Sequence, residues 1–202
     1  MKAFFVFVLA LVFSSYFTYS QDIDSLYSVF NASRGATRIS FANEIVKYAF
    51  ENSYIDNLTT LKTSDDEAFV NATVHDAMGC YLMLAKGDYT KSNDFFKLTF
   101  EYHEKRENAA IINLINNNIG SNYVRMGDYE NAVTYKMKCY EWEKSVGDVE
   151  SLSGTLNDLG VIYSHWKRHE TAIRYFEEAE RVERPLNRPM QYANRLSSLA
   201  KE

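Results

Sequence analysis

Small and apolar positions recur along the chain at a constant stride of forty residues. Shifting the sequence by this stride brings Cys80, Gly120 and Gly160 into register. The same shift aligns further sets of positions, which are Gly87, Gly127 and Lys167; Ser92, Ala132 and Ala172; Phe95, Tyr135 and Tyr175; and Thr99, Cys139 and Ala179. A fixed period of this kind indicates a repeat architecture, in which each unit buries its apolar face against its neighbours.

Each period contains two stretches with the spacing of amphipathic helices, separated by a short break. The pattern predicts helices at 113–126 and 128–146 in the middle unit, and at 152–166 and 169–183 in the last unit. Gly87 and Gly127 stand where the first helix of a unit must end, in a position that tolerates a left-handed residue. The Asp that follows each of these glycines can cap the second helix.

The small residues predict where the two helices of a unit come closest. Gly120 and Gly160 permit a close approach, because a larger side chain would hold the helices apart. Tyr135 and Tyr175 stand one stride apart on the second helices. We expect their rings to fill the space against the neighbouring unit.

These positions resemble the signature of the tetratricopeptide repeat (TPR) family. The matching residues are Ile119, Gly120, Tyr123, Gly127, Tyr129 and Ala132 in one unit, and Leu159, Gly160, Tyr163, Ala172, Phe176 and Ala179 in the next. The resemblance implies an all-α fold, a right-handed solenoid of antiparallel helical hairpins. The commonest TPR period is about 34 residues, so the extra residues are expected after the second helix begins. Lys136 stands where the family prefers an aromatic residue, which leaves the packing there open.

The flanks complete the predicted organisation of the chain. Residues 1–20 are predicted to be a signal peptide, and 21–63 an N-terminal degenerate helical hairpin with an apolar stripe at Phe41, Ile45, Tyr48 and Ala49. Residues 64–202 are predicted to be the TPR array, with about three repeats and the first helix of a fourth at 189–202.

The start of the chain has the pattern of an export signal. Lys2 precedes the apolar run 4–13, and small residues at 18–20 flank a cleavage position before Gln21. The predicted location is therefore periplasmic or otherwise extracytoplasmic. The alternative is an uncleaved N-terminal membrane anchor, which the shortness of the run and its interruption by two serines disfavour.

Composition and charge narrow the classes of function. With 46% hydrophobic and 24% charged residues, two prolines and eight glycines, the chain is expected to fold into long helices. The net charge of −5 and the lack of a basic stripe disfavour binding of nucleic acid or of a membrane surface by this segment. Cys80 and Cys139 occupy small-residue positions in different repeats, so we expect buried free thiols.

The TPR resemblance also implies a binding surface, because the first helices of that family line a concave groove that takes peptides. On this resemblance the candidate residues are Tyr81, Asn117, Ser121, Arg125, Asn157, Val161 and His165, with Leu84, Val124 and Ser164 beside them. Asn117 and Asn157 stand one stride apart, and each amide can donate to and accept from a peptide backbone. Arg125 can pair with a ligand carboxylate. The alternative is that these are solvated polar residues on a helix face.

No other pattern in the sequence points to chemistry. His165 and His169 are four residues apart, but a predicted turn separates them and no third metal ligand is evident. No phosphate-binding loop, dinucleotide turn, zinc motif or nucleophile elbow occurs. We therefore expect no cofactor, no metal and no enzymatic activity.

Two hypotheses for function remain from the sequence. The long period is similar to that of bacterial peptide-sensing regulators and kinesin light chains, and an export signal followed by TPRs is similar to the sensor half of envelope regulators of Bacteroidetes. This resemblance implies an extracytoplasmic peptide- or protein-binding module, the sensor part of a truncated signalling or transcriptional regulator. The alternative is a structural scaffold or oligomerisation domain, in which the uncapped C-terminal helix mates with a second copy.

Overall fold

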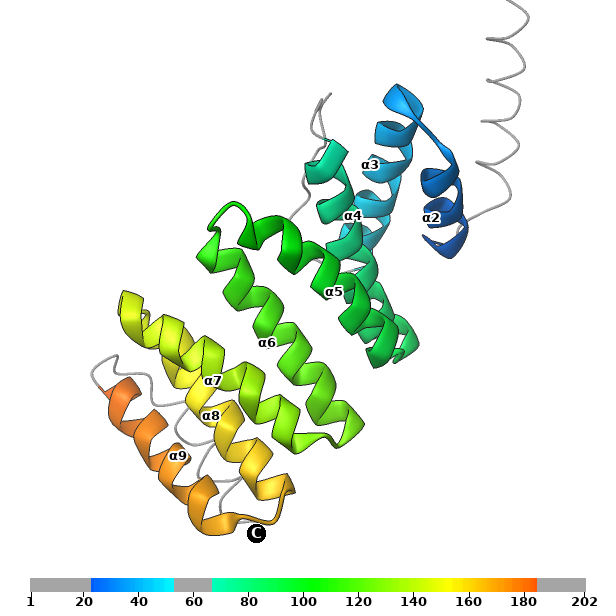
Figure 1. Cartoon of the computed structure of the whole chain (residues 1–202). Helices are drawn as coiled ribbons and strands as arrows, with labels where there is room; N and C mark the ends of the chain where they lie inside the picture. Colours follow the sequence, from blue (N-terminus) through cyan, green and yellow to red (C-terminus); the bar gives the residue numbers. More distant parts are fainter. Residues whose placement is uncertain (1–22, 53–66, 185–202) are drawn as a thin grey trace, which may run out of the picture. The chain divides into compact units, whose positions relative to one another are not determined.

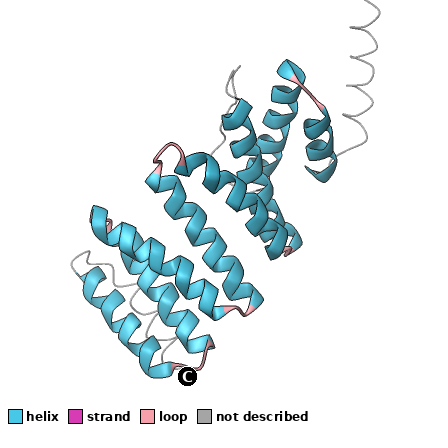
Figure 2. Cartoon of the chain, viewed as in Figure 1, coloured by secondary structure: helices cyan, strands magenta, loops and turns pink. Residues whose placement is uncertain are grey.

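The computed structural model describes residues 23–52 and 67–184. These residues form eight α-helices, α2 to α9, and one π-helical turn, η1, and within these two ranges there is no strand (Figures 1 and 2). The predicted all-α class of helical hairpins is confirmed. The predicted signal peptide at 1–20, the boundary between 63 and 64, and the helix at 189–202 lie outside the described residues. The chain divides between Leu84 and Ala85 into two compact units.

The first unit contains three described helices, α2 (Ile23–Ala32), α3 (Gly35–Glu51) and α4 (Glu67–Tyr81). The middle helix, α3, packs against both α2 and α4. Of the predicted apolar stripe, Ile45 and Ala49 are buried, and Phe41 and Tyr48 are half-buried. The sequence pattern therefore identified the face of α3 that enters the core.

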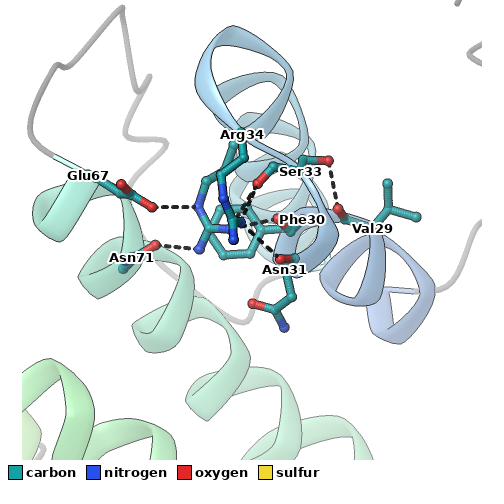
Figure 3. Close-up of polar contacts among 8 residues, drawn as sticks. Val29, Phe30, Asn31, Ser33, Arg34, Glu67 and Asn71 are labelled. Atoms are coloured by element: carbon teal, nitrogen blue, oxygen red, sulfur yellow. Dashed lines mark hydrogen bonds and ion pairs between the residues drawn. The ribbon is translucent and has the colours of Figure 1, made fainter.

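The side chain of Arg38 joins the three helices of the first unit. Its Nη1 donates a hydrogen bond to the carbonyl oxygen of Phe30 (2.9 Å), and its guanidinium lies 3.8 Å from the centre of the Phe30 ring. Its Nη2 donates to Asn71 Oδ1 (2.8 Å), and its Nε lies 3.6 Å from Glu67 Oε1. Figure 3 shows Glu67 and Asn71 on α4 facing the end of α2. A planar group with five donors can connect several elements in this way.

The second unit is a run of helices in which each packs on the next. Its helices are α5 (Tyr89–Glu104), α6 (Ala109–Met126), α7 (Tyr129–Val146), α8 (Val149–His165) and α9 (His169–Glu183); the π-helical turn η1 (Leu82–Lys86) lies at the division between the units. Of the helices predicted in the last two repeats, α7 and α9 begin and end within one residue of prediction, whereas α6 and α8 begin earlier.

The long period is absorbed by the helices and not by loops. α7 has 18 residues, and only Gly147 and Asp148 separate it from α8. The extra residues were predicted to follow the start of the second helix of a unit. They do so, because some lengthen α7 and others form the first turn of α8. Short connections of this kind keep successive helices antiparallel and adjacent.

The turns inside the repeats follow the predicted chemistry. Gly87 and Gly127 have φ values of 65° and 74°, and Lys167, the aligned residue of the last repeat, also has a positive φ of 62°. The carboxylates of Asp88 and Asp128 each accept a hydrogen bond, at 3.2 Å, from the backbone N–H three residues later. The predicted left-handed glycines and Asp caps are confirmed.

The helix crossings show that Gly120 and Gly160 occupy equivalent positions. Each faces the residue sixteen positions later, which is Lys136 for Gly120 and Phe176 for Gly160. A Cβ atom on Gly160 would lie 2.6 Å from the Phe176 ring, so the close approach predicted at the glycines is confirmed.

The two tyrosines do not pack as the sequence pattern suggested. The ring of Tyr135 stacks on Tyr123 of its own hairpin at 5.6 Å, and that of Tyr175 stacks on Tyr163 at 5.3 Å. The hydroxyl of Tyr175 also lies 3.8 Å from the sulfur of Met137 in the preceding hairpin. Both rings therefore stack between the two helices of their own hairpin, and Tyr175 in addition meets the neighbouring unit, where its ring was predicted to lie.

Candidate functional site

Lys136 is a buried lysine at the centre of the second unit. It lies on α7 at the position that Phe96 and Phe176 occupy one stride away on either side. Lys136 is only 2% exposed. The stem of its side chain packs on Gly120, because a Cβ atom added to this glycine would lie 3.3 Å from Lys136 Cγ. The stem thus fills the place that a phenylalanine ring takes one stride away on either side, because four methylene groups can pack as an apolar chain.

The ammonium group of Lys136 connects α6 with α8. Its Nζ donates to Asn117 Oδ1 on α6 (2.6 Å) and to Asp158 Oδ2 on α8 (2.5 Å). The side chain of Asp158 is 47% exposed, so this carboxylate stands at the boundary between the core and solvent. A buried charge requires such partners, since an unpaired ammonium in the core would be costly.

A pocket of about 430 Å³ lies next to this ion pair. Three helices form its wall, with Ala110, Asn113, Leu114 and Asn117 from α6, Trp142 and Glu143 from α7, and Ser151, Gly154, Thr155 and Asp158 from α8, together with the capping residue Asp148. We call it the Glu143 pocket. Figure 1 shows the ribbons of these three helices in the green-to-yellow part of the chain.

Glu143 is the most deeply buried acid of this pocket. It is 3% exposed, and its Oε1 accepts a hydrogen bond from Asn113 Nδ2 (3.1 Å). Burial raises the pKa of Glu143, while the hydrogen bond from Asn113 opposes the rise. Two buried oxygens of the pocket, Glu143 Oε2 and Asn113 Oδ1, have no hydrogen-bond partner among the described residues.

Glu143 was not among the residues predicted from the sequence, and the role of Lys136 was left open. The signal for Lys136 was a lysine aligned with two phenylalanines. Glu143 is one stride from Glu183, which is also buried at 5% exposure. The signal in the sequence was therefore a glutamate that recurs after forty residues in the apolar pattern, which would have predicted a buried acid.

The predicted groove residues of α6 and α8 lie along one face of each helix, because they are four residues apart. Asn117, Ser121, Asn157 and Val161 are half-buried, whereas Arg125 and His165 are exposed. The Ser121 hydroxyl donates to the carbonyl oxygen of Asn117 (2.9 Å), and the His165 ring stacks on Tyr129 at 6.4 Å. We call these six residues the α6/α8 face; of them, only Asn117 also lines the Glu143 pocket.

Three other groove candidates lie differently. Tyr81 belongs to the first unit, is 3% exposed, and donates its hydroxyl hydrogen to Asp24 Oδ2 at 3.3 Å. Leu84 is 52% exposed and lies in the π-helical turn. Ser164 is buried at 5% exposure. The structure therefore brings the candidates of α6 and α8 together in the second unit, whereas Tyr81 and Leu84 belong to the first unit.

A second pocket, of about 370 Å³, lies between α5 and α6. Asn93 lines this pocket, and the fully buried Asn122 donates to Asn93 Oδ1 (2.8 Å) and to Ser92 Oγ (2.9 Å). Both amide hydrogens of Asn122 are therefore used inside the protein. This polar network holds α5 and α6 together.

The remaining candidate groups show no reactive arrangement. Cys80 and Cys139 are buried thiols that form no disulfide, as predicted, and burial raises the pKa of Cys139 to about 12. The turn at 166–168 separates His165 from His169. In the described ranges no cluster of His, Cys, Asp or Glu is suited to hold a metal ion. None of the described helices combines the length and apolar content of a membrane span.

Comparison with known proteins shows what part of the second unit is similar to. No curated protein matches the chain. Residues 111–183, which include nearly all of α6 to α9, match the family model described as Tetratricopeptide repeat. Such repeats generally mediate protein–protein interactions and are typically non-catalytic. The residues of the α6/α8 face, and all but one of the residues that line the Glu143 pocket, lie within this matched segment.

Proposed function

We propose that the protein is an exported binding module that captures an extended segment of a partner protein along the α6/α8 face. The observation that carries the proposal is that polar and apolar side chains follow the same four-residue spacing on α6 and α8, one stride apart. A partner lying across both helices would meet Asn117 and Asn157 with their amides at equivalent positions. Arg125 and His165, both exposed, end the two rows.

Asn117 contributes to this surface in two ways. Its Oδ1 accepts from Lys136, so its NH₂ group is the part that can donate to a partner carbonyl. Replacing Asn117 would also remove a contact of the buried ammonium, so a change there combines effects on stability and on binding. Asn157 has no such contact with Lys136 and is the cleaner position for a binding test.

The location of the protein is part of the same proposal. The charged start, apolar run and small residues of 1–20 support export with cleavage before Gln21. A sensor role, as part of an envelope regulator, is the form of this function that the sequence resemblance favours. Mass spectrometry of the protein isolated from its host checks the first step, since a chain that retains Met1 in the cytoplasm would contradict export.

The binding proposal is tested with a random peptide display library selected on the full-length protein. Selected peptides are then titrated against the wild type, Asn157→Ala and Arg125→Ala, with Arg174→Ala on the exposed surface of α9 as the matched control. We expect each of the first two changes to weaken binding about tenfold, and the control to leave it unchanged. Selection of no peptide, or equal affinity for all variants, would show that the α6/α8 face is not the binding surface.

A further inference from the structure

We propose that the Glu143 pocket binds the side chain of an arginine of the partner. This inference rests on the proposed function and adds to it the chemical class of the residue that is recognised. Glu143 Oε2 and Asn113 Oδ1 are both buried and unpartnered, and both residues line the pocket. A buried acceptor without a donor costs free energy, which a donating ligand group would recover.

The charges around the pocket favour a cation. Glu143, Asp148 and Asp158 are its titratable lining residues, and all three are acids. Hydrogen bonding from Ser151 lowers the pKa of Asp148, which therefore carries its negative charge near neutral pH. A cation bound beside Glu143 would also stabilise the ionised form of that carboxyl and offset the effect of its burial.

An anionic group finds no comparable partner in the pocket. The nearby cation, Lys136, is buried and its ammonium already donates to Asn117 and Asp158. The start of α8 is capped, because Asp148 accepts the hydrogen bond of the Ser151 backbone N–H (3.1 Å). The groups that would hold a carboxylate or phosphate are therefore engaged inside the protein.

The shape and the lining distinguish a guanidinium from an ammonium. Trp142 offers an indole ring, and Leu114, which is 51% exposed, offers an aliphatic surface for the stem of a long side chain. A guanidinium is planar, stacks on aromatic rings, and presents five N–H donors in a fixed fork. It can meet two separate oxygens at once, whereas a lysine ammonium is a compact and strongly hydrated point charge.

The test uses three short blocked peptides, Gly-Arg-Gly, Gly-Lys-Gly and Gly-citrulline-Gly, titrated into the ¹⁵N-labelled full-length protein near neutral pH. The chain has two tryptophans, so the indole N–H of Trp142 reports on the pocket and that of Trp166 serves as the internal control. We expect the arginine peptide to shift the Trp142 signal saturably and to leave Trp166 unchanged. Citrulline, which has the same shape without the charge, should bind about tenfold more weakly, and lysine several-fold more weakly.

The variant Glu143→Gln keeps the size of the side chain and removes its charge. It should weaken arginine binding about tenfold, while Glu141→Gln, on the exposed surface of the same helix, should not change it. No shift of Trp142 at about 10 mM arginine peptide, or equal binding of citrulline or lysine, would overturn the proposal on the wild-type protein alone. Because this assay contains no partner, its failure leaves binding at the α6/α8 face untouched, and failure of the display selection leaves the pocket untouched.

Discussion

The ring of Phe176 lies so close to the backbone of Gly160 that no side chain fits between α8 and α9 at that point. A Cβ atom on Gly160 would lie 2.6 Å from the Cε1 atom of Phe176. At the equivalent crossing of α6 and α7, a Cβ atom on Gly120 would lie 3.3 Å from Lys136 Cγ, which is part of a flexible chain. The two repeats therefore share one crossing geometry but differ in how tightly it is filled.

Gly160→Ala should destabilise the protein by about 1–3 kcal/mol, because the new methyl group must displace the Phe176 ring. Gly120→Ala should cost less, since the Lys136 stem can shift. Gly154→Ala is the matched control in α8, where a Cβ atom meets nothing within 4 Å, and it should stabilise the helix by about 0.5–1 kcal/mol. Denaturant unfolding measures all three, and equal stability of the Gly160 and Gly154 variants would contradict the crossing described here.

Lys136→Phe should be tolerated, because a phenylalanine occupies the equivalent position of both neighbouring repeats. Exchanging a buried ion pair for an apolar side chain is often neutral or stabilising. Asp158→Asn should instead destabilise by about 1–2 kcal/mol, a modest loss because this carboxylate is 47% exposed. When Asp158→Asn is combined with Lys136→Phe, it should no longer lower the free energy of unfolding. Thermal unfolding of the wild type, both single variants and the double variant measures this. Additive effects of the two changes would argue against the pairing of Lys136 with Asp158.

Lys167→Gly should stabilise the protein by about 1 kcal/mol. Lys167 has a φ of 62° in the turn before α9, a conformation that is strained for a residue with a side chain. Glycine already stands at the aligned positions 87 and 127. Lys167→Ala, which keeps the strain and removes the charge, is the control. A rise in the unfolding midpoint for alanine as large as that for glycine would show that charge, and not backbone conformation, is responsible.

Asp76→Asn should change how stability depends on pH. Burial raises the pKa of Asp76 from 3.8 to about 6, so the folded state favours the protonated carboxyl. Its stabilising contribution is present below pH 3.8 and is lost as the pH rises through 6. The variant should therefore gain stability relative to the wild type across this window, by up to about 3 kcal/mol, since one pKa unit corresponds to about 1.4 kcal/mol.

His75, next to Asp76 in the sequence, also makes stability depend on pH. The test therefore compares the free energies of unfolding of the variant and the wild type at each pH. Burial, and then the charge of Arg38, lower the pKa of His75, so its contribution is lost as the pH falls, in the opposite sense to that of Asp76. Subtracting the unfolding free energies of wild type and Asp76→Asn at each pH removes the His75 contribution. A difference that stays flat from acid to neutral pH would contradict a raised pKa at Asp76.

The sequence alone determined the features that depend on neighbours along the chain. The stride of forty residues, the left-handed turns at Gly87 and Gly127 and the caps at Asp88 and Asp128 follow from local backbone geometry and from side chains within three residues. The helix pairs, the buried cysteines and the close approach at Gly160 followed from the same periodic pattern. Such features are readable because an α-helix fixes which residues share a face.

Only the tertiary structure decided which polar groups meet inside the second unit. Lys136 pairs with Asn117 and Asp158 on two different helices, and Glu143 closes a pocket with Asn113. Periodicity places each residue on a face, but it does not say how far a long side chain reaches or which carboxylate it finds. The choice of partner depends on the distances between packed helices and on the cost of leaving a buried charge unpaired. The spacing of residues along the chain does not determine either quantity.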